Sequence, residues 1–386
     1  MVSRPQRVLR GKDVPLSASF LELFFDLAFV LALSQLARHL LADLTLIGAL
    51  RTALLLTGTW WIWVTTTWLT DWYDPETSAI RGLLIVATLG SLLAGVAIPQ
   101  ALDGRGVLFA SAYVSVHIAR GAVTAYTLRG HPLQSRALRV LAWYSVSAAP
   151  WMAGAFLPGW RVPLWVLAIA IDLAGPRLGW PTPRLGRAQR QELHLAGEHF
   201  AERYQQIMII VLGELVLVAG LTYSDSRLGL AETGAFLLVF ITAVMIGLLY
   251  VRPAGQRLGP AIERADPARL GVLTGYLHLV MIAGIVVTAV GAELSIAHPT
   301  VTGDTTAALV IQGGPILFLL GRILFSVAIH RRLSWARVAG LFVLGVAAIV
   351  LRLPLLAVSA VATGVLFVVA TADHAAILAP RRARSR

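Results

Sequence analysis

Two carboxylates lie one helical turn apart in an apolar segment near the N-terminus, the run FLELFFD at 20–26. Residues four apart share one face of a helix, so Glu22 and Asp26 predict a paired acidic site. Such a pair would bind a cation, or it would relay a proton, because two like charges close together favour proton retention by one of them. In the alternative interpretation, Glu22 lies at a membrane interface and Asp26 pairs with an arginine of a neighbouring helix.

A second group of polar residues follows the helical period between 199 and 214. The residues on this face are His199, Arg203, Gln206 and Glu214, with Glu202 at its border. We predict that Arg203 pairs with Asp26 or Glu22, since each of these charges is costly alone in a membrane. The alternative for this face is structural, namely a set of buried ion pairs that determines how the helices pack.

Glu214 lies too far along this helix from Arg203 to reach it, so it needs another partner. Candidates for that partner are His278, Arg120 and Arg322. His117 and Arg120 are three residues apart and face together. The full set of predicted substrate- or ion-binding residues is Glu22, Asp26, His117, Arg120, His199, Glu202, Arg203, Gln206, Glu214, His278 and Arg322.

Several kinds of chemistry have no support in the sequence. The chain has no cysteine, and it lacks a P-loop, a G-x-S-x-G motif and a dinucleotide-binding glycine run. A metal site could be assembled from His117, His278, Glu214 and Glu293, although no H-E-x-x-H spacing requires it. We therefore predict no cofactor and no metal, and we assign no catalytic residue.

The elements that must position these residues are membrane helices. The chain is 57% hydrophobic and 13% charged, with a mean hydropathy of +0.75, whereas soluble domains are about a quarter charged. Apolar runs of about 20 residues recur along the chain, long enough to cross a bilayer as helices. We predict an all-α polytopic transmembrane bundle of about twelve spans. Their expected ranges are 18–41, 45–69, 80–100, 106–128, 138–157, 162–176, 198–221, 231–251, 270–295, 306–329, 337–351 and 354–374.

The basic residues predict the orientation of these spans. Most of the arginines fall in the N-terminus, the tail and every second connection, so the positive-inside rule places both termini in the cytoplasm of a cell (inner) membrane. The same bias explains the net charge of +12 without a nucleic-acid partner. The expected partners are the lipid bilayer and an unidentified ion or small molecule. A homo-oligomer is compatible with the sequence, and a re-entrant hairpin in place of the last two spans stays open.

Short internal matches favour two parallel six-helix repeats. The pattern F-x-E-x-F at 20–24 corresponds to F-x-E-x-Y at 200–204, and Arg120 corresponds to Arg322. The predicted divisions are a basic N-terminus at 1–17, a first repeat at 18–190, a second repeat at 191–376 and a basic tail at 377–386. Transporters often place a site at the interface between such repeats.

Several motifs spread along the chain are characteristic together. They are ELFFDLAFV at 22–30, WYD at 72–74 with Arg81, ERY at 202–204 followed by IIVLGE at 209–214, and YLH at 276–278 followed by Gly284, Ile285 and Gly291. They resemble the signatures of the bacterial low temperature requirement A family. The resemblance implies a polytopic bacterial membrane protein, but no particular activity. Leu215 stands where the family often has a serine.

Three classes of function agree with these patterns. The first is a permease or channel-like transporter of a proton, small cation or solute, which the intramembrane charges and the repeats favour. The second is an intramembrane enzyme acting on a hydrophobic substrate, with Glu, His and Arg as acid, base and electrostatic groups. The third is a structural or sensory protein tied to cold adaptation. A water-filled cavity at the charges would favour the first class, a cavity open to lipid the second, and a sealed cluster the third.

Overall fold

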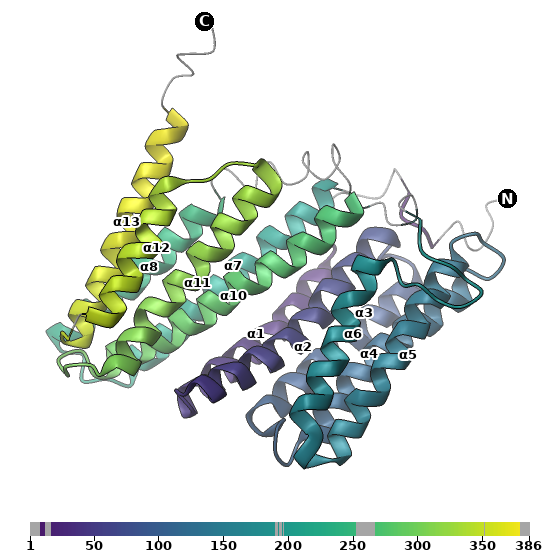
Figure 1. Ribbon diagram of the computed structural model, residues 1–386, viewed down its shortest axis with the longest axis horizontal. Coiled ribbons are helices and arrows are strands. Elements are labelled where there is room, and N and C mark those ends of the chain that lie inside the picture. Colours follow the sequence, from purple (N-terminus) through teal and green to yellow (C-terminus); the bar gives the residue numbers. More distant parts are fainter. Residues whose placement is uncertain are drawn as a thin grey trace, which may run out of the picture. The chain divides into compact units, whose positions relative to one another are not determined.

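The protein is built from α-helices (Figure 1). The structure, a computed structural model, describes residues 8–11, 17–189, 192, 195, 197–251, 267–350 and 352–378. These residues form no β-strand. The helices are α1 (Phe20–Ala42), α2 (Leu46–Trp72), α3 (Ser78–Ala97), α4 (Gly106–Thr127), α5 (Gln134–Phe156), α6 (Arg161–Leu178), α7 (Gly197–Ser224), α8 (Leu230–Tyr250), α10 (Pro267–Ala297), α11 (Thr305–His330), α12 (Trp335–Val350) and α13 (Leu355–Leu378).

Nine of the helices in the described part are long and apolar enough to cross a membrane. The three that fall short are α5, α6 and α12. Arg136 and Arg139 make the start of α5 polar, α6 carries three charged residues, and α12 has only 16 residues. The all-helical polytopic membrane fold is therefore confirmed. The count of twelve spans, the six-plus-six repeat and the orientation of the termini stay predictions.

The described chain forms two compact units. Unit 1 contains the chain up to Ile207 and the start of α10, up to Gly275. Unit 2 contains the chain from Met208 to the end of α8, and then the chain from Tyr276 onward. The division falls inside α7 and α10, so each of these two helices contributes residues to both units. The predicted site residues from Glu22 to Gln206 thus all belong to unit 1.

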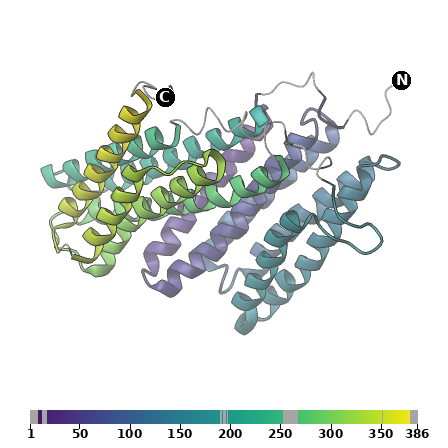
Figure 2. The ribbon, with the colours of Figure 1, turned by 45° about the horizontal axis from the view of Figure 1, so that its top comes forward.

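In unit 1, α1 packs against α2 and α3, and the series continues from α3 to α4, α5 and α6 (Figures 1 and 2). The start of α1 is defined by a capping box. The side chain of Ser19 accepts from the amide of Glu22, and Glu22 Oε2 accepts from the amide of Ser19 at 2.8 Å. This reciprocal pair satisfies two amides that a helix otherwise leaves open. It also orients Glu22 at the first turn of α1.

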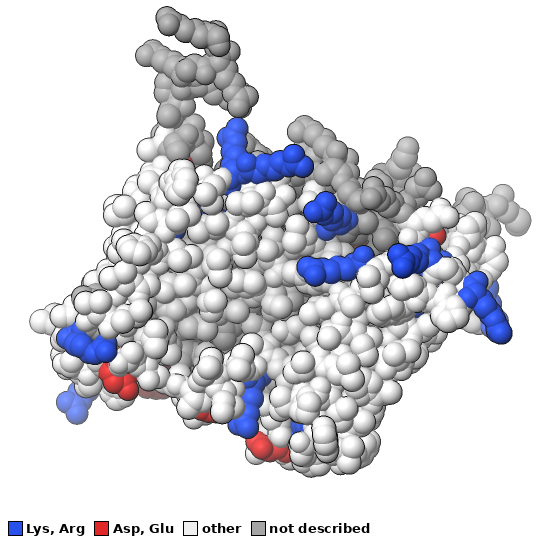
Figure 3. Space-filling view, viewed as in Figure 1, with Lys and Arg blue, Asp and Glu red and all other residues white. Residues whose placement is uncertain are grey.

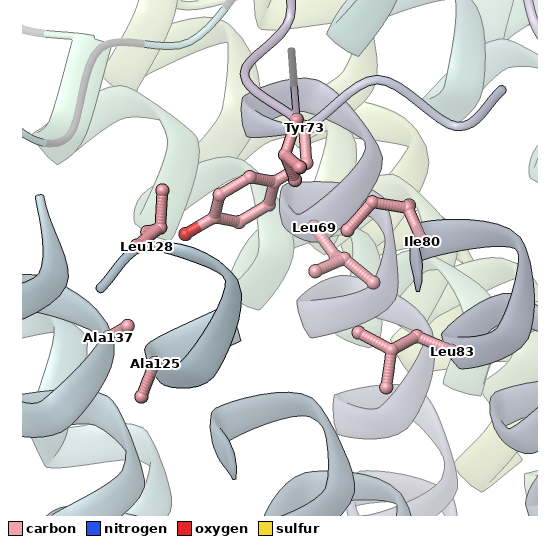
Figure 4. Packing of buried hydrophobic residues seen from close by; sticks show 8 residues of the cluster. Leu69, Tyr73, Ile80, Leu83, Ala125, Leu128 and Ala137 are labelled. Carbon is pink, nitrogen blue, oxygen red and sulfur yellow. The ribbon is translucent and has the colours of Figure 1, made fainter. Parts of the chain in front are cut away.

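The ends of α2, α3, α4 and α5 meet in a small apolar cluster (Figure 4). Tyr73 at the end of α2 lies among Leu69, Ile80 and Leu128 in this cluster. The backbone of residues 8–11 adds to the same end of α2, with Arg10 N donating to Trp72 O at 3.1 Å. These contacts hold the last turn of α2 in place.

In unit 2, α8 packs against α13, and α12 packs against α11 and α13. Glycines let α10 and α11 approach at backbone distance. A Cβ atom at Gly284 would lie 2.5 Å from Phe318 N and 2.8 Å from Gly314 O. Small residues at such crossings are typical of membrane helices, because packing rather than the hydrophobic effect drives their association.

Exposed charged side chains are concentrated near the ends of the helices on one face of the molecule (Figure 3). On the face shown in Figure 3, Lys, Arg, Asp and Glu lie toward helix ends, and uncharged residues cover the surface between them. This is the pattern expected of helices surrounded by lipid, where an exposed charge is costly. Several charged residues within the helices are buried instead, and some of them form the candidate site.

Candidate functional site

Asp26 and Arg203 form a two-pronged ion pair in unit 1. Arg203 Nη1 donates to Asp26 Oδ2 at 2.8 Å, and Nη2 donates to Oδ1 at 2.7 Å. Neither side chain is exposed by more than 1%. The planar guanidinium matches a carboxylate in this geometry, which makes the pair both strong and directional. The prediction that Arg203 pairs with Asp26 or Glu22 of α1 is confirmed, with Asp26 at 2.7 Å and Glu22 at 3.6 Å.

Each partner of this ion pair has further bonds. Asp26 Oδ1 also accepts from Trp63 Nε1 at 2.8 Å. Arg203 Nη1 donates to Gln206 Oε1 at 3.2 Å, and Gln206 Nε2 donates to Glu202 Oε1 at 2.9 Å. Glu202 and Gln206 are half-buried, whereas Asp26 and Arg203 are sealed. A polar chain therefore runs from the unit's accessible surface to the buried pair.

His199 lies between carboxylates of two other helices. Its Nε2 is 3.1 Å from Glu22 Oε1 of α1, and its Nδ1 is 3.2 Å from Asp71 Oδ1 of α2. A neutral imidazole has one donor and one acceptor nitrogen, whereas an imidazolium donates from both. An imidazolium would donate to both carboxylates, from Nε2 to Glu22 and from Nδ1 to Asp71.

Arg10 completes the group from the N-terminal segment. Its Nη1 donates to Thr70 O at 2.6 Å and lies 3.4 Å from His199 Nε2. We call Arg10, Glu22, Asp26, Asp71, His199 and Arg203 the buried charge cluster. The cluster has three acidic and two guanidinium side chains, so with all three carboxylates ionised its formal charge is zero when His199 is protonated.

Aromatic side chains of α2 and α7 surround this cluster. The rings of Trp60 and Trp63 stack at 4.7 Å, and Tyr204 meets Trp63 edge-on at 5.0 Å. Trp63 also lies 5.9 Å from the Arg203 guanidinium. All three rings are buried. Large apolar walls keep water away from the charges and strengthen their interactions.

Two members of the buried charge cluster are not among the site residues predicted from the sequence. Asp71 lies just beyond the expected second span, which ends at 69, because α2 continues to Trp72. The signal that could have identified it is its position inside the apolar run WLTDW at 68–72. Arg10 falls in the segment interpreted as a basic cytoplasmic N-terminus, and nothing local distinguishes it from Arg4 or Arg7.

The predicted pair on α4 lies elsewhere in unit 1. His117 packs between the rings of Tyr113 and Tyr144, each 4.3 Å away, and its Nδ1 lies 2.9 Å from Tyr113 O. Arg120 lines a cavity between α2, α4 and α5. Neither belongs to the buried charge cluster, so the sequence prediction combines two separate groups of residues.

The remaining predicted residues lie in unit 2. His278 Nε2 is 3.0 Å from the hydroxyl of Tyr250, and Arg322 Nε donates to Leu249 O at 3.0 Å. Glu214 is buried, and its pairing with His278, Arg120 or Arg322 stays a prediction. Among the described residues, no group of three His, Asp or Glu side chains has an arrangement that could hold a metal ion.

Comparison with known proteins gives a family. A family model described as Bacterial low temperature requirement A protein matches residues 17–371. The curated Uncharacterized protein RA0937 of Rhizobium meliloti (strain 1021) is 36% identical to this chain over 333 residues, which is 85% of this chain and 81% of the relative. No solved structure matches the chain. The family match includes all of the buried charge cluster except Arg10.

Proposed function

This chain belongs to the bacterial low temperature requirement A family of membrane proteins, and on that premise we propose that it is a proton-coupled permease whose coupling proton resides on His199. The observation that carries the proposal is the position of His199 of α7, with one ring nitrogen facing Glu22 of α1 and the other facing Asp71 of α2. Histidine is the side chain whose charge changes most readily near neutral pH.

Loss of one proton would change how three helices are held together. A neutral His199 that keeps its proton on Nδ1 still donates to Asp71, and its Nε2 lone pair can accept from Arg10 Nη1, but its hydrogen bond to Glu22 is lost. It also leaves the buried charge cluster with one negative charge uncompensated, which is costly away from water. Movement of α7 away from α1 or α2 would relieve that cost. Proton occupancy would thus be coupled to helix position, as alternating access requires.

The arrangement favours a proton over a metal cation as the coupling ion. Both oxygens of Asp26 already accept from Arg203, so a cation would have to displace a guanidinium that neutralises the same carboxylate. A proton needs only a basic nitrogen that can bind and release it, and His199 supplies one between Glu22 and Asp71.

The burial of these side chains favours a second candidate function, in which the buried charge cluster only specifies how the helices pack. Glu22, Asp26 and His199 are each 0% exposed, and sealed ion pairs also serve to specify helix packing. No comparable observation favours the intramembrane enzyme, because neither His nor Glu lines the cavity beside Arg120. Transport and stability must therefore be measured on the same variants.

The test compares proton movement in proteoliposomes loaded with a pH-sensitive dye. We expect His199→Gln to abolish protein-dependent proton flux, because glutamine keeps hydrogen-bonding groups but cannot carry the proton. His298→Gln, at an exposed position between α10 and α11, is the matched control and should retain flux. Equal flux in the two variants would exclude the proton role of His199. A loss of flux that follows a parallel loss of thermal stability would favour the structural candidate.

Helix movement can be tested separately because the chain has no cysteine. Leu27 of α1 and Glu198 of α7 are exposed and accept spin labels at Leu27→Cys and Glu198→Cys without touching the buried charge cluster. We expect the distance between the labels to change with pH in the labelled parent and to stay constant when His199→Gln is added. A distance independent of pH in the parent would contradict the coupling.

A further inference from the structure

A cavity lies in unit 1 between the last turns of α2, the end of α4 and the start of α5. Its empty volume is about 420 Å³, including its open mouth. The lining residues are Thr65, Trp68, Leu69, Trp72, Tyr73, Arg120, Gly121, Thr124, Arg136, Ala137, Val140, Tyr144 and Trp180. They include two arginines and five aromatic residues but no carboxylate. None belongs to the buried charge cluster, so the cavity is distinct from the proposed proton site.

Two of the residues that line this cavity each have a buried hydrogen-bond donor without a partner among the described residues. Arg120 is 7% exposed, and its Nη2 has no hydrogen-bond partner in the described part of the chain. Trp68 is 4% exposed, and the same holds for its Nε1. The second arginine differs, because Arg136 Nη2 donates to the Tyr73 hydroxyl at 2.9 Å and Nη1 donates to Glu192 O. The unpaired groups are thus donors, and one of them is charged.

A buried guanidinium with no counter-charge is among the costliest groups in a protein interior. Arg120 lies seven residues before Thr127, the last residue of α4, which places it roughly 10 Å from that end at 1.5 Å per residue. A water molecule could accept from Trp68 but would not neutralise Arg120. An anion would do both.

We propose that this cavity binds a small anion of halide or nitrate size, held by Arg120 and by the indole N–H of Trp68. The edges of aromatic rings carry partial positive charge, so the surrounding Trp72 and Tyr144 suit an anion with a diffuse charge. The absence of a carboxylate from the lining leaves the positive charge of Arg120 available to the ligand.

Unit 2 contains a similar arrangement of arginines. Arg322 of α11 is fully buried, and its Nη1 and Nη2 have no hydrogen-bond partner among the described residues. Arg337 near the start of α12 is instead occupied, since its Nε donates to Asp373 Oδ2 at 2.7 Å and its Nη1 to Ser326 Oγ at 2.6 Å. Each unit therefore has, within a helix, one arginine with a buried Nη atom that lacks a partner among the described residues, and one arginine near the start of the next helix whose guanidinium donates to side-chain oxygens. An isolated packing defect would not be expected to recur in this form.

The test is a titration of the full-length protein in detergent with sodium bromide, at an ionic strength kept constant with sodium gluconate. Bromide quenches tryptophan fluorescence, and Trp68 and Trp72 line the cavity. We expect a saturable component of quenching above the linear collisional one. Arg120→Gln should raise the half-saturating concentration by roughly tenfold or more, because a charged hydrogen-bond donor is lost. Arg129→Gln, on the exposed turn after α4, is the control and should leave the saturation unchanged.

Melting temperatures provide a second test that does not depend on fluorescence, in case Arg120→Gln alters the fold. In gluconate, Arg120→Gln should melt above the parent, because an uncompensated buried charge has been removed. Bromide should raise the melting temperature of the parent but not that of Arg120→Gln. Purely linear quenching in the parent, or the same saturation in Arg120→Gln, would overturn the anion site.

A lipid phosphate is the other source of negative charge near this end of α4. Repeating the titration in nanodiscs of phosphatidylcholine, with and without phosphatidylglycerol, separates the two sources. Saturable quenching of equal affinity in both discs supports a free anion. Its disappearance in the discs that contain phosphatidylglycerol would mean that a lipid headgroup fills the cavity, and it would overturn the proposal of a free anion.

Discussion

Asp71 Oδ1 lies 3.2 Å from Nδ1 of His199, although 128 residues separate them in the chain. Asp71 is near the last turn of α2 and His199 is in the first turn of α7, so the contact joins two helices that approach each other only in the folded protein. The opposite ring nitrogen of His199 faces Glu22, which is itself positioned by the capping box of α1. The imidazole is therefore held by two carboxylates.

Replacement of Asp71 should destabilise the protein through His199. In Asp71→Asn, the amide removes one negative charge from the buried charge cluster and weakens the bond to Nδ1. We expect the free energy of unfolding to fall by about 1–3 kcal/mol, the cost of impairing a buried charged hydrogen bond. Unfolding by SDS in mixed micelles measures the change. Asp103→Asn, at an exposed position before α4, should change stability by less than about 0.5 kcal/mol.

Because Asp26 and Arg203 form an ion pair, we predict that the effects of substituting them on the free energy of unfolding are strongly non-additive. Arg203→Met leaves the Asp26 carboxylate buried without its counter-charge, so we expect a loss of about 3–5 kcal/mol. Adding Asp26→Asn should restore much of this loss, since the amide keeps an acceptor for Trp63 and removes the orphan charge. Recovery should stay incomplete because Arg203 Nε also lies 3.6 Å from Glu22 Oε1. A double-mutant cycle of unfolding free energies would show additive losses if the two residues acted independently.

Loss of the capping box at the start of α1 should reduce stability by a smaller amount. Ser19→Ala removes the side-chain acceptor for the Glu22 amide, and loss of such a cap costs about 0.5–2 kcal/mol. It should also loosen Glu22, so the dependence of stability on His199 should weaken in the same variant. Thermal melting of His199→Gln, made both in the parent and in the Ser19→Ala variant, tests this link. If His199→Gln lowers the melting temperature equally in both backgrounds, the capping box does not contribute to the stability of the buried charge cluster.

The contact between α10 and α11 should not tolerate a methyl group. Gly284→Ala would place a Cβ atom 2.5 Å from Phe318 N, so one backbone must move. We expect a destabilisation of about 1–3 kcal/mol, as for other overpacked contacts. Gly345→Ala in α12 has open space at its Cβ position, and it should be neutral or stabilising because alanine favours helix. Melting temperatures in detergent compare the two variants directly.

Positions of the helices could be predicted because lipid imposes a simple rule. Apolar runs of membrane length must be helical, since the backbone has no other hydrogen-bond partners in hydrocarbon. The expected span at 18–41 corresponds to α1, and that at 198–221 corresponds to α7. The span at 162–176 appears as α6, but its three charged residues exclude it from the helices that qualify as membrane-crossing on length and composition. The sequence therefore predicts where the helices lie more readily than it predicts which of them cross the membrane.

The sequence by itself determined the helical membrane fold, the family and the pairing of Arg203 with an acidic residue of the first helix, Asp26 or Glu22. Two isolated buried charges of opposite sign cost more than one neutral pair, and this energetic rule operates without knowledge of the fold. Only the tertiary structure brought Asp71 and Arg10 to His199, and only it placed Arg120 in a separate cavity. The reason is that several helices carry charges of suitable sign, and the choice among them depends on which helices lie side by side, a property of the whole packing rather than of any local pattern.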